Sequence, residues 1–194
     1  MSKAKDIIML ILSSPSGAGK TTLSKKIQQK YTNFKISISH TTRKPRSNEI
    51  DGIDYFFITE EQFLEKINKN EFYEYAKIFD NYYGTSRQSV EELRKENSDI
   101  LFDIDWQGTK QLSKFKELNL VKIFILPPDL GTLKTRLVQR NQDNINSVEK
   151  RLKSFEEDRM HWKDYDYVLI NDNLENCFSQ IEKIINNSKN LPIF

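Results

Sequence analysis

Residues 14–22 read Ser-Pro-Ser-Gly-Ala-Gly-Lys-Thr-Thr and directly follow an apolar run, Ile-Ile-Met-Leu-Ile-Leu, at residues 7–12. A buried strand, a glycine-rich loop and a lysine in this order are typical of a phosphate-binding loop, the P-loop. The two glycines let backbone N–H groups face phosphate oxygens, the lysine reaches the outer phosphates, and the threonine after it is placed to bind Mg²⁺. We therefore expect a nucleotide's phosphates to contact Ser14, Pro15, Ser16, Gly17, Ala18, Gly19, Lys20, Thr21 and Thr22.

One position of this loop departs from the usual pattern. G-x-x-x-x-G-K-[ST] has glycine where this chain has Ser14. The alternative interpretation is a turn of small residues that joins a strand to a helix and binds no ligand. A lysine and two threonines directly after two glycines favour phosphate binding.

The composition limits the class of protein. A chain of 194 residues with 37% hydrophobic content suits one compact unit with a sizeable core. Lys and Arg number 30 against 28 Asp and Glu, a net charge of +2, so generic nucleic-acid binding is not indicated. The single cysteine, Cys177, excludes an internal disulfide and a cysteine-cluster metal site, which fits a reducing cytosol.

The N-terminal segment has Lys3 and Lys5 before the apolar residues 7–12, as a signal peptide would. That apolar run is short, and the small residues after it belong to the phosphate loop. No other run approaches the length of a membrane span. We therefore expect a cytoplasmic protein without a membrane partner.

Apolar runs and helical spacing alternate along most of the chain. Strands are predicted at residues 7–12, 100–104, 121–126 and 165–170. Helices are predicted near residues 20–30, 87–96, 106–118, 129–140, 147–160 and 174–187. The alternation predicts an α/β fold, in which flanking helices cover both faces of a parallel sheet and the nucleotide lies at the carboxyl ends of the strands.

Residues 38–86 break this alternation. Short aromatic strands at residues 54–58 and 72–76 flank one helix, and Thr59 with Gln62 forms a capping box at its start. An α/β core with a P-loop holds a nucleotide by itself. We therefore expect this inserted mixed α/β subdomain to bind the acceptor molecule.

Residues 128–158 form a second candidate insertion. Arg136, Arg140 and Arg151 flank a polar loop there, as in a mobile helical lid. The expected core comprises residues 1–37, 87–127 and 159–194.

Several separate motifs carry a family resemblance. They are T-T-R-x-P-R-x-x-E-x-x-G-x-D-Y at residues 41–55, E-Y-A at 74–76, N-Y-Y-G-T at 81–85, D-I-D-x-Q-G at 103–108, the lid arginines, and Asn-Asp at 171–172. In order and spacing, from about residue 7 to about residue 180, this chain resembles the guanylate kinases. The resemblance implies a single guanylate-kinase-like domain with a P-loop NTPase core. It also implies transfer of a phosphoryl group from ATP to GMP with Mg²⁺ as cofactor, and it leaves dGMP open as a further acceptor.

The resemblance also assigns the acceptor site. Two arginines and two tyrosines hold the GMP phosphate, while two carboxylates and two hydroxyls read the N1–H and N2–H donors of guanine. The implied GMP-binding residues are Ser39, Arg43, Arg46, Glu49, Tyr55, Glu74, Tyr83, Thr85 and Asp105. Taken alone, Arg43 and Arg46 fit a basic surface turn equally well, and Glu74 on an alternating strand fits a solvated face.

The transferring phosphoryl group needs positive charge more than covalent help. Candidates for this catalytic charge are Lys20, Arg46, Arg140 and Arg151. Asp103 ends an apolar run, where P-loop enzymes place an acid near Mg²⁺, so Thr21 and Asp103 are the expected metal ligands, the latter through water. Arg136 and Asn171 are expected near the donor phosphate or adenine. The alternatives are solvated helix charges for the arginines, and a turn for Asp103 and Asn171.

Other functions remain open at this point. A kinase for AMP or UMP would use the same core, although Glu74 with Asp105 favours guanine. A non-catalytic module would bind a phosphorylated partner through the acceptor site, although the intact Lys20 and Thr21 favour an enzyme. A GTPase switch has no use for the second phosphate site around Arg43. The sequence predicts no oligomeric state.

Overall fold

The computed structural model describes residues 7–78, 80–139 and 145–190. Five of its strands form one parallel sheet in the order β2-β7-β1-β8-β9. They are β1 (Met9–Ser13), β2 (Phe34–Ile36), β7 (Asp99–Asp103), β8 (Leu120–Leu126) and β9 (Tyr167–Ile170). The predicted α/β fold with a parallel sheet is confirmed.

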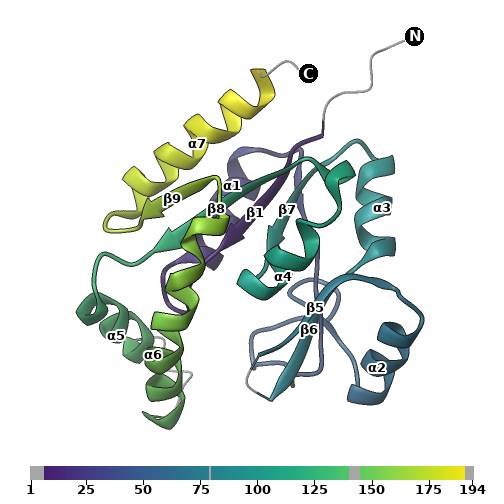
Figure 1. The fold of residues 1–194 in the computed structure, drawn as a ribbon, viewed down its shortest axis with the longest axis horizontal. Helices are drawn as coiled ribbons and strands as arrows, with labels where there is room; N and C mark the ends of the chain where they lie inside the picture. The colour runs from purple at the N-terminus through teal and green to yellow at the C-terminus, as the bar shows by residue number, and fades with distance from the viewer. Residues whose placement is uncertain (1–6, 79, 140–144, 191–194) are drawn as a thin grey trace.

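Helices cover both faces of this sheet (Figure 1). They are α1 (Lys20–Lys30), α3 (Arg87–Lys95), α4 (Trp106–Leu112) and α7 (Leu174–Asn190). Leu10 and Leu12 of β1 pack in a cluster with α1 and α7, whereas Met9 and Ile11 pack in a second cluster with residues of α3 and α4. The strand is buried on both faces, which explains its continuous apolar sequence.

A second sheet of four strands, in the order β4-β3-β6-β5, lies at one end of the core. It contains β3 (His40–Thr41), β4 (Phe56–Phe57), β5 (Phe72–Ile78) and β6 (Asn81–Ser86). Helix α2 (Glu60–Asn68) packs on it through Phe63, which stacks on Phe72 and Tyr82 at centroid distances of 4.6 and 5.3 Å. The predicted capping box is confirmed, since the Thr59 hydroxyl accepts from the Gln62 N–H and the Gln62 side chain accepts from the Thr59 N–H.

Two further helices, α5 (Leu130–Gln139) and α6 (Ile145–Met160), project from the core on the same side as the second sheet (Figure 1). Leu133 and Leu137 of α5 pack with Phe155 of α6. Short 3-10 helices lie at η1 (Lys116–Leu118) and η2 (His161–Asp164). Within the described ranges, no helix is long and apolar enough to cross a membrane.

Some predicted boundaries are wrong. The helix predicted over residues 106–118 ends at Leu112, because Phe115 leaves the helical path and packs edge-on against Tyr73. The strand predicted over residues 54–58 is only β4, because Asp51 and Asp54 accept hydrogen bonds from nearby backbone N–H groups and close a turn. Strands β2, β3 and β6 were not predicted.

Candidate active site

The P-loop conformation depends on its two glycines. Gly17 and Gly19 have φ values of +89° and +103°, a region that side chains rarely adopt. A Cβ on Gly17 would lie 2.8 Å from Leu133 Cδ1, and one on Gly19 would overlap the Asn171 amide. Ser14 is not among the described non-glycine residues with positive φ, and its hydroxyl donates to the Pro15 carbonyl at 2.9 Å. Serine therefore fits where the usual pattern has glycine.

The loop leads into the N-terminus of α1. Gly19 is the N-cap residue, no side chain caps the helix there, and its first turn contains no acidic residue. The free backbone N–H groups and the positive end of the helix dipole therefore favour an anion at this point.

Two adjoining pockets meet at this loop, each with a volume of about 370 Å³. The first, here called the loop pocket, is lined by most of the P-loop together with residues of α4 and α6. The second, here called the sheet pocket, is lined mainly by residues of and near the second sheet. Both are lined by Ser16, Lys20, Arg46, Tyr55, Ile78, Asp103, Asp105 and Arg151.

Lys20 occupies the boundary between these pockets. Its ammonium forms an ion pair with Asp103 at the end of β7 and donates to the Ile104 carbonyl at 3.4 Å. The Ser24 hydroxyl also donates to Asp103, at 3.4 Å. The parallel strands β1 and β7 thus bring the P-loop lysine and an acidic strand end together, as the α/β topology predicts.

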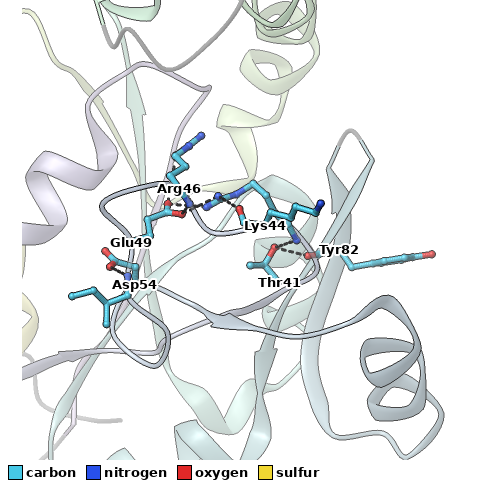
Figure 2. A network of polar contacts seen from close by, with 8 residues as sticks. Thr41, Lys44, Arg46, Glu49, Asp54 and Tyr82 are labelled. Atoms are coloured by element: carbon cyan, nitrogen blue, oxygen red, sulfur yellow. Dashed lines mark hydrogen bonds and ion pairs between the residues drawn. The ribbon is translucent and has the colours of Figure 1, made fainter.

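A tight turn organises the two arginines of the sheet pocket. Arg43 binds both carboxylate oxygens of Glu49, at 2.9 and 2.8 Å. The same carboxylate accepts from the Arg46 backbone N–H at 2.8 Å, and Figure 2 shows Glu49 beside Arg46 in this turn. Burial alone would raise the pKa of Glu49, but these hydrogen bonds hold it below its usual value. Glu49 therefore positions the arginines and does not line the sheet pocket.

Two tyrosines complete that end of the sheet pocket. The rings of Tyr55 and Tyr83 meet edge-on at a centroid distance of 6.0 Å, and the Arg43 guanidinium lies 5.3 Å from the Tyr55 ring centre. Burial, with the nearby charge of Asp103, raises the pKa of Tyr55. The phenol therefore stays protonated and can donate a hydrogen bond to an anion.

Glu74 and Asp105 lie at the other end of the sheet pocket. Glu74 on β5 is only 4% exposed and accepts from the Thr85 hydroxyl at 2.5 Å. Burial, reinforced by the negative charge of Asp105, raises the pKa of Glu74 to about 7. Asp105 is the N-cap residue of α4 and accepts from the Gly108 N–H at 2.9 Å, and burial raises its pKa also. The buried carboxylates provide acceptors that suit a ligand carrying adjacent N–H donors.

The helix α6 contacts both the P-loop and α4. Arg151 donates to the Ser16 hydroxyl at 2.7 Å, and the Trp106 indole N–H donates to Asp158 at 3.2 Å. The Trp106 ring also stacks on His161 at a centroid distance of 3.6 Å. Burial, with the charge of Asp105, raises the pKa of Asp158 to about 6. These contacts hold α6 against the phosphate loop.

Most of the predicted site residues line one or both pockets. Ser14, Pro15, Ser16, Gly17, Gly19, Lys20 and Thr21 line the loop pocket, and Ser39, Arg43, Arg46, Tyr55, Glu74, Tyr83 and Asp105 line the sheet pocket. Those that line neither pocket are Ala18, Thr22, Glu49, Thr85, Arg136 and Asn171. Arg140, a predicted catalytic residue, lies outside the described residues.

Asn171 and Arg136 buttress the P-loop from behind. Asn171 is 3% exposed, and its side-chain amide donates to the Ala18 carbonyl at 2.7 Å. Its backbone carbonyl accepts from the Arg136 guanidinium at 2.9 Å. Both residues therefore support the loop conformation in this structure.

Replacing Asn171 with alanine is expected to lower the free energy of unfolding by about 1–3 kcal/mol, because the buried Ala18 carbonyl loses its donor. Urea unfolding followed by circular dichroism measures this. Asn176, which is exposed on α7, provides the matched Asn176→Ala control. Equal stability of the two variants would contradict the buttressing role.

This chain matches a known protein family along most of its length. The family model of guanylate kinase matches residues 7–188. This chain belongs to the guanylate kinase family. The match spans the P-loop, the second sheet and the helices α5 and α6.

Individual guanylate kinases agree with this membership. That of Rickettsia bellii is 46% identical over 185 residues, covering 95% of this chain and 96% of that protein. That of Paramagnetospirillum magneticum is 44% identical over 178 residues, covering 92% and 83%. The crystal structure of guanylate kinase from Anaplasma phagocytophilum superposes with a TM-score of 0.79 at 32% identity, covering 95% of this chain and 87% of that one.

Some lining residues were missed by the sequence analysis. Trp106 and Gln107 directly follow Asp105, and Ser154, Glu157 and Asp158 lie on α6 with Arg151. Helical spacing could have indicated Ser154 and Asp158, because residues three and seven positions after Arg151 lie on the same face of the helix. Ala76, Ile78 and Asn81 line the sheet pocket through the alternation of strands β5 and β6, of which β6 was not predicted.

Proposed function

We propose that this member of the guanylate kinase family catalyses ATP + GMP giving ADP + GDP. The observation that carries the proposal is the sharing of Lys20, Arg46 and Asp103 by the two adjoining pockets. A donor phosphate on the P-loop and an acceptor phosphate at the arginine turn would meet there. Transfer between two bound phosphates needs this adjacency.

The second sheet with α2, within residues 38–86, is the proposed acceptor-binding subdomain. Arg43 and Arg46 would hold the GMP phosphate, helped by the phenols of Tyr55 and Tyr83. Glu49 keeps the guanidinium of Arg43 in a fixed plane before the substrate arrives, because both of its oxygens are engaged. This preorganisation lowers the entropy lost on binding.

We assign guanine selection to the carboxylates of Glu74 and Asp105, together with the hydroxyls of Ser39 and Thr85. A carboxylate accepts from both the N1–H and N2–H groups of guanine. Adenine presents a lone pair at N1, which would face these acceptors without a proton. Mismatches that leave buried polar groups unpaired discriminate by roughly 10⁴ or more.

The residues at the loop pocket fit Mg²⁺ bound together with ATP. Thr21 and Asp103 offer hard oxygen ligands at the edge of the phosphate site. Among the described residues, no group of three or more His, Cys, Asp or Glu side chains is arranged to hold a metal by itself. That is the pattern expected of Mg²⁺, which takes most of its ligands from phosphates and water. When bound, the ion neutralises charge on the donor phosphates.

The remaining catalytic charge comes from this chain's own cations. Lys20 would bind the transferring phosphoryl group, Arg46 would hold the acceptor, and Arg151 would approach from α6. Arg140 is proposed to act with them. The lid, residues 128–158, would cover the site and exclude water, which prevents hydrolysis of ATP.

A coupled assay of ADP release tests the function directly. ATP and Mg²⁺ are supplied with GMP, dGMP, AMP, CMP or UMP in turn. GMP-dependent turnover supports the proposal. Turnover only with another nucleotide would reassign the acceptor site, and no turnover by folded protein would favour a phospho-ligand binding module.

The pH dependence of GMP binding follows from Glu74. Because its pKa is raised to about 7, the unliganded protein carries a protonated Glu74 at lower pH, whereas guanine needs the ionised form. The apparent Kd of GMP is expected to rise about tenfold between about pH 8 and pH 6. Isothermal titration calorimetry measures it. The Glu74→Gln variant is the control, since GMP's own phosphate titration remains and the Glu74 contribution is lost.

A further inference from the structure

Gly108 lies in the first turn of α4, buried directly behind the Glu74 carboxylate. A Cβ built on Gly108 would overlap Glu74 Oε2 and lie 2.9 Å from Glu74 Cδ. The backbone of Gly108 has no positive φ, so its conformation does not demand glycine. What demands glycine at this position is the space that the carboxylate occupies.

The helix cannot simply move away from the carboxylate. Gln111, one turn further along α4, accepts from the Tyr75 N–H at 3.2 Å and donates to the Tyr75 carbonyl at 2.6 Å. Tyr75 is the neighbour of Glu74 on β5, so these two hydrogen bonds fix the separation of helix and strand at this point. An added methyl group must therefore displace the end of the Glu74 side chain.

The Glu74 carboxylate is also held from the opposite side. Thr85 donates to Oε1, while Oε2 occupies the space that a Cβ on Gly108 would need. Gly108 in addition donates its N–H to Asp105 Oδ1. One residue without a side chain therefore touches both carboxylates of the sheet pocket.

We propose that Gly108 is a positioning residue for guanine recognition, which sets the orientation of the Glu74 carboxylate by leaving room for one of its oxygens. The proposal rests on the proposed GMP kinase activity. Gly108 acts through Glu74 and does not touch the substrate itself.

The Gly108→Ala variant isolates this contact. It retains the backbone N–H that binds Asp105, and alanine favours the helix more than glycine does. The group that must yield is the end of a side chain, so the fold is expected to persist. We expect the Kd of GMP to rise about tenfold or more, because charge-assisted hydrogen bonds to the base are misaligned. The Kd of ATP and kcat at saturating GMP should stay within about twofold, since no donor-side contact changes.

A base analogue of GMP distinguishes misaligned guanine recognition from a general structural effect, which would weaken both nucleotides equally. IMP keeps the N1–H of guanine and lacks the 2-amino group. If Gly108 aligns Glu74 with both donors, Gly108→Ala weakens GMP more than IMP, and the preference for GMP narrows. An unchanged GMP-to-IMP ratio with unchanged GMP affinity overturns the proposal.

A double-mutant cycle tests whether the effect passes through Glu74. Glu74→Asp withdraws the carboxylate by one methylene, so adding Gly108→Ala to it should change the Kd of GMP by less than about twofold. Additive effects overturn the proposal. Should Gly108→Ala alone fail to fold, the same contact predicts that the double variant folds, and an unfolded double variant also overturns it.

The matched control is Lys110→Ala, an exposed position on the same helix α4 that lines neither pocket. It should bind both nucleotides as the unaltered protein does. The unaltered protein is assayed first with GMP and ATP. Absence of GMP turnover there refutes the proposed function, whereas normal turnover there with a wild-type-like Gly108→Ala refutes only the role of Gly108.

Discussion

Replacing Lys20 with alanine is expected to lower kcat at least about a hundredfold, because the charge on the transferring phosphoryl group loses its P-loop cation. Lys20 lines both pockets, so its ammonium is within reach of a donor and an acceptor phosphate. Because a contact made mainly in the transition state is lost, kcat should fall more than KM for GMP rises. Steady-state ADP release at saturating substrates measures the change.

Two controls are needed to interpret the effect of Lys20→Ala on kcat. Lys25→Ala removes a charge from an exposed position on the same helix and should leave kcat unchanged. Lys20→Ala also deprives Asp103 of its ion-pair partner, so thermal unfolding must show that the variant is folded. Near-normal turnover by folded Lys20→Ala would refute the assigned role.

Replacing Glu74 with glutamine is expected to raise the KM for GMP about a hundredfold and to narrow the preference for GMP over IMP and AMP. The amide has nearly the same shape as the carboxylate but places a donor where guanine needs an acceptor. The hydrogen bond from Thr85 can persist on the amide oxygen. Kinetics with the three acceptors, at saturating ATP, measure both effects.

The stability of Glu74→Gln should not fall. The pKa of Glu74 is raised to about 7 by burial, so the ionised form is disfavoured in the folded protein. As pH rises from about 4.5 to about 7, the unfolded chain loses its proton first and the folded state is destabilised, and glutamine removes this dependence. Glu61→Gln, exposed on α2, is the matched control. Unchanged GMP kinetics in Glu74→Gln would contradict guanine reading by this residue.

The core was predictable because its signals are local. The apolar run before the P-loop and the glycine spacing define β1 and the start of α1, and the Thr59 capping box marks α2. Strands such as β3, with two residues, and β6, with a polar sequence containing Gly84, carry no such signal. Their pairing depends on contacts between segments distant in sequence, which periodicity does not reveal.

The candidate site was predictable where a motif gives a residue its chemistry, and less so where packing does. The motif containing Arg43, Arg46 and Glu49 identified three residues that the structure joins in one turn. The sequence did not show that Glu49 positions the two arginines and does not itself line the pocket. Asn171 was expected near the nucleotide from its motif, but its hydrogen bond to the Ala18 carbonyl, which depends on packing, was not predicted. Such differences arise because burial is set by tertiary contacts.

The ion pairs within the site have a consequence for how nucleotides enter it. Lys20 already has Asp103 as a counter-ion, and Arg43 already has Glu49. A phosphate that binds at these positions therefore competes with a carboxylate that is already paired with the cation. Affinity should then depend on ionic strength less steeply than the number of cations suggests, and selection among phosphate compounds should depend more on fit than on net charge.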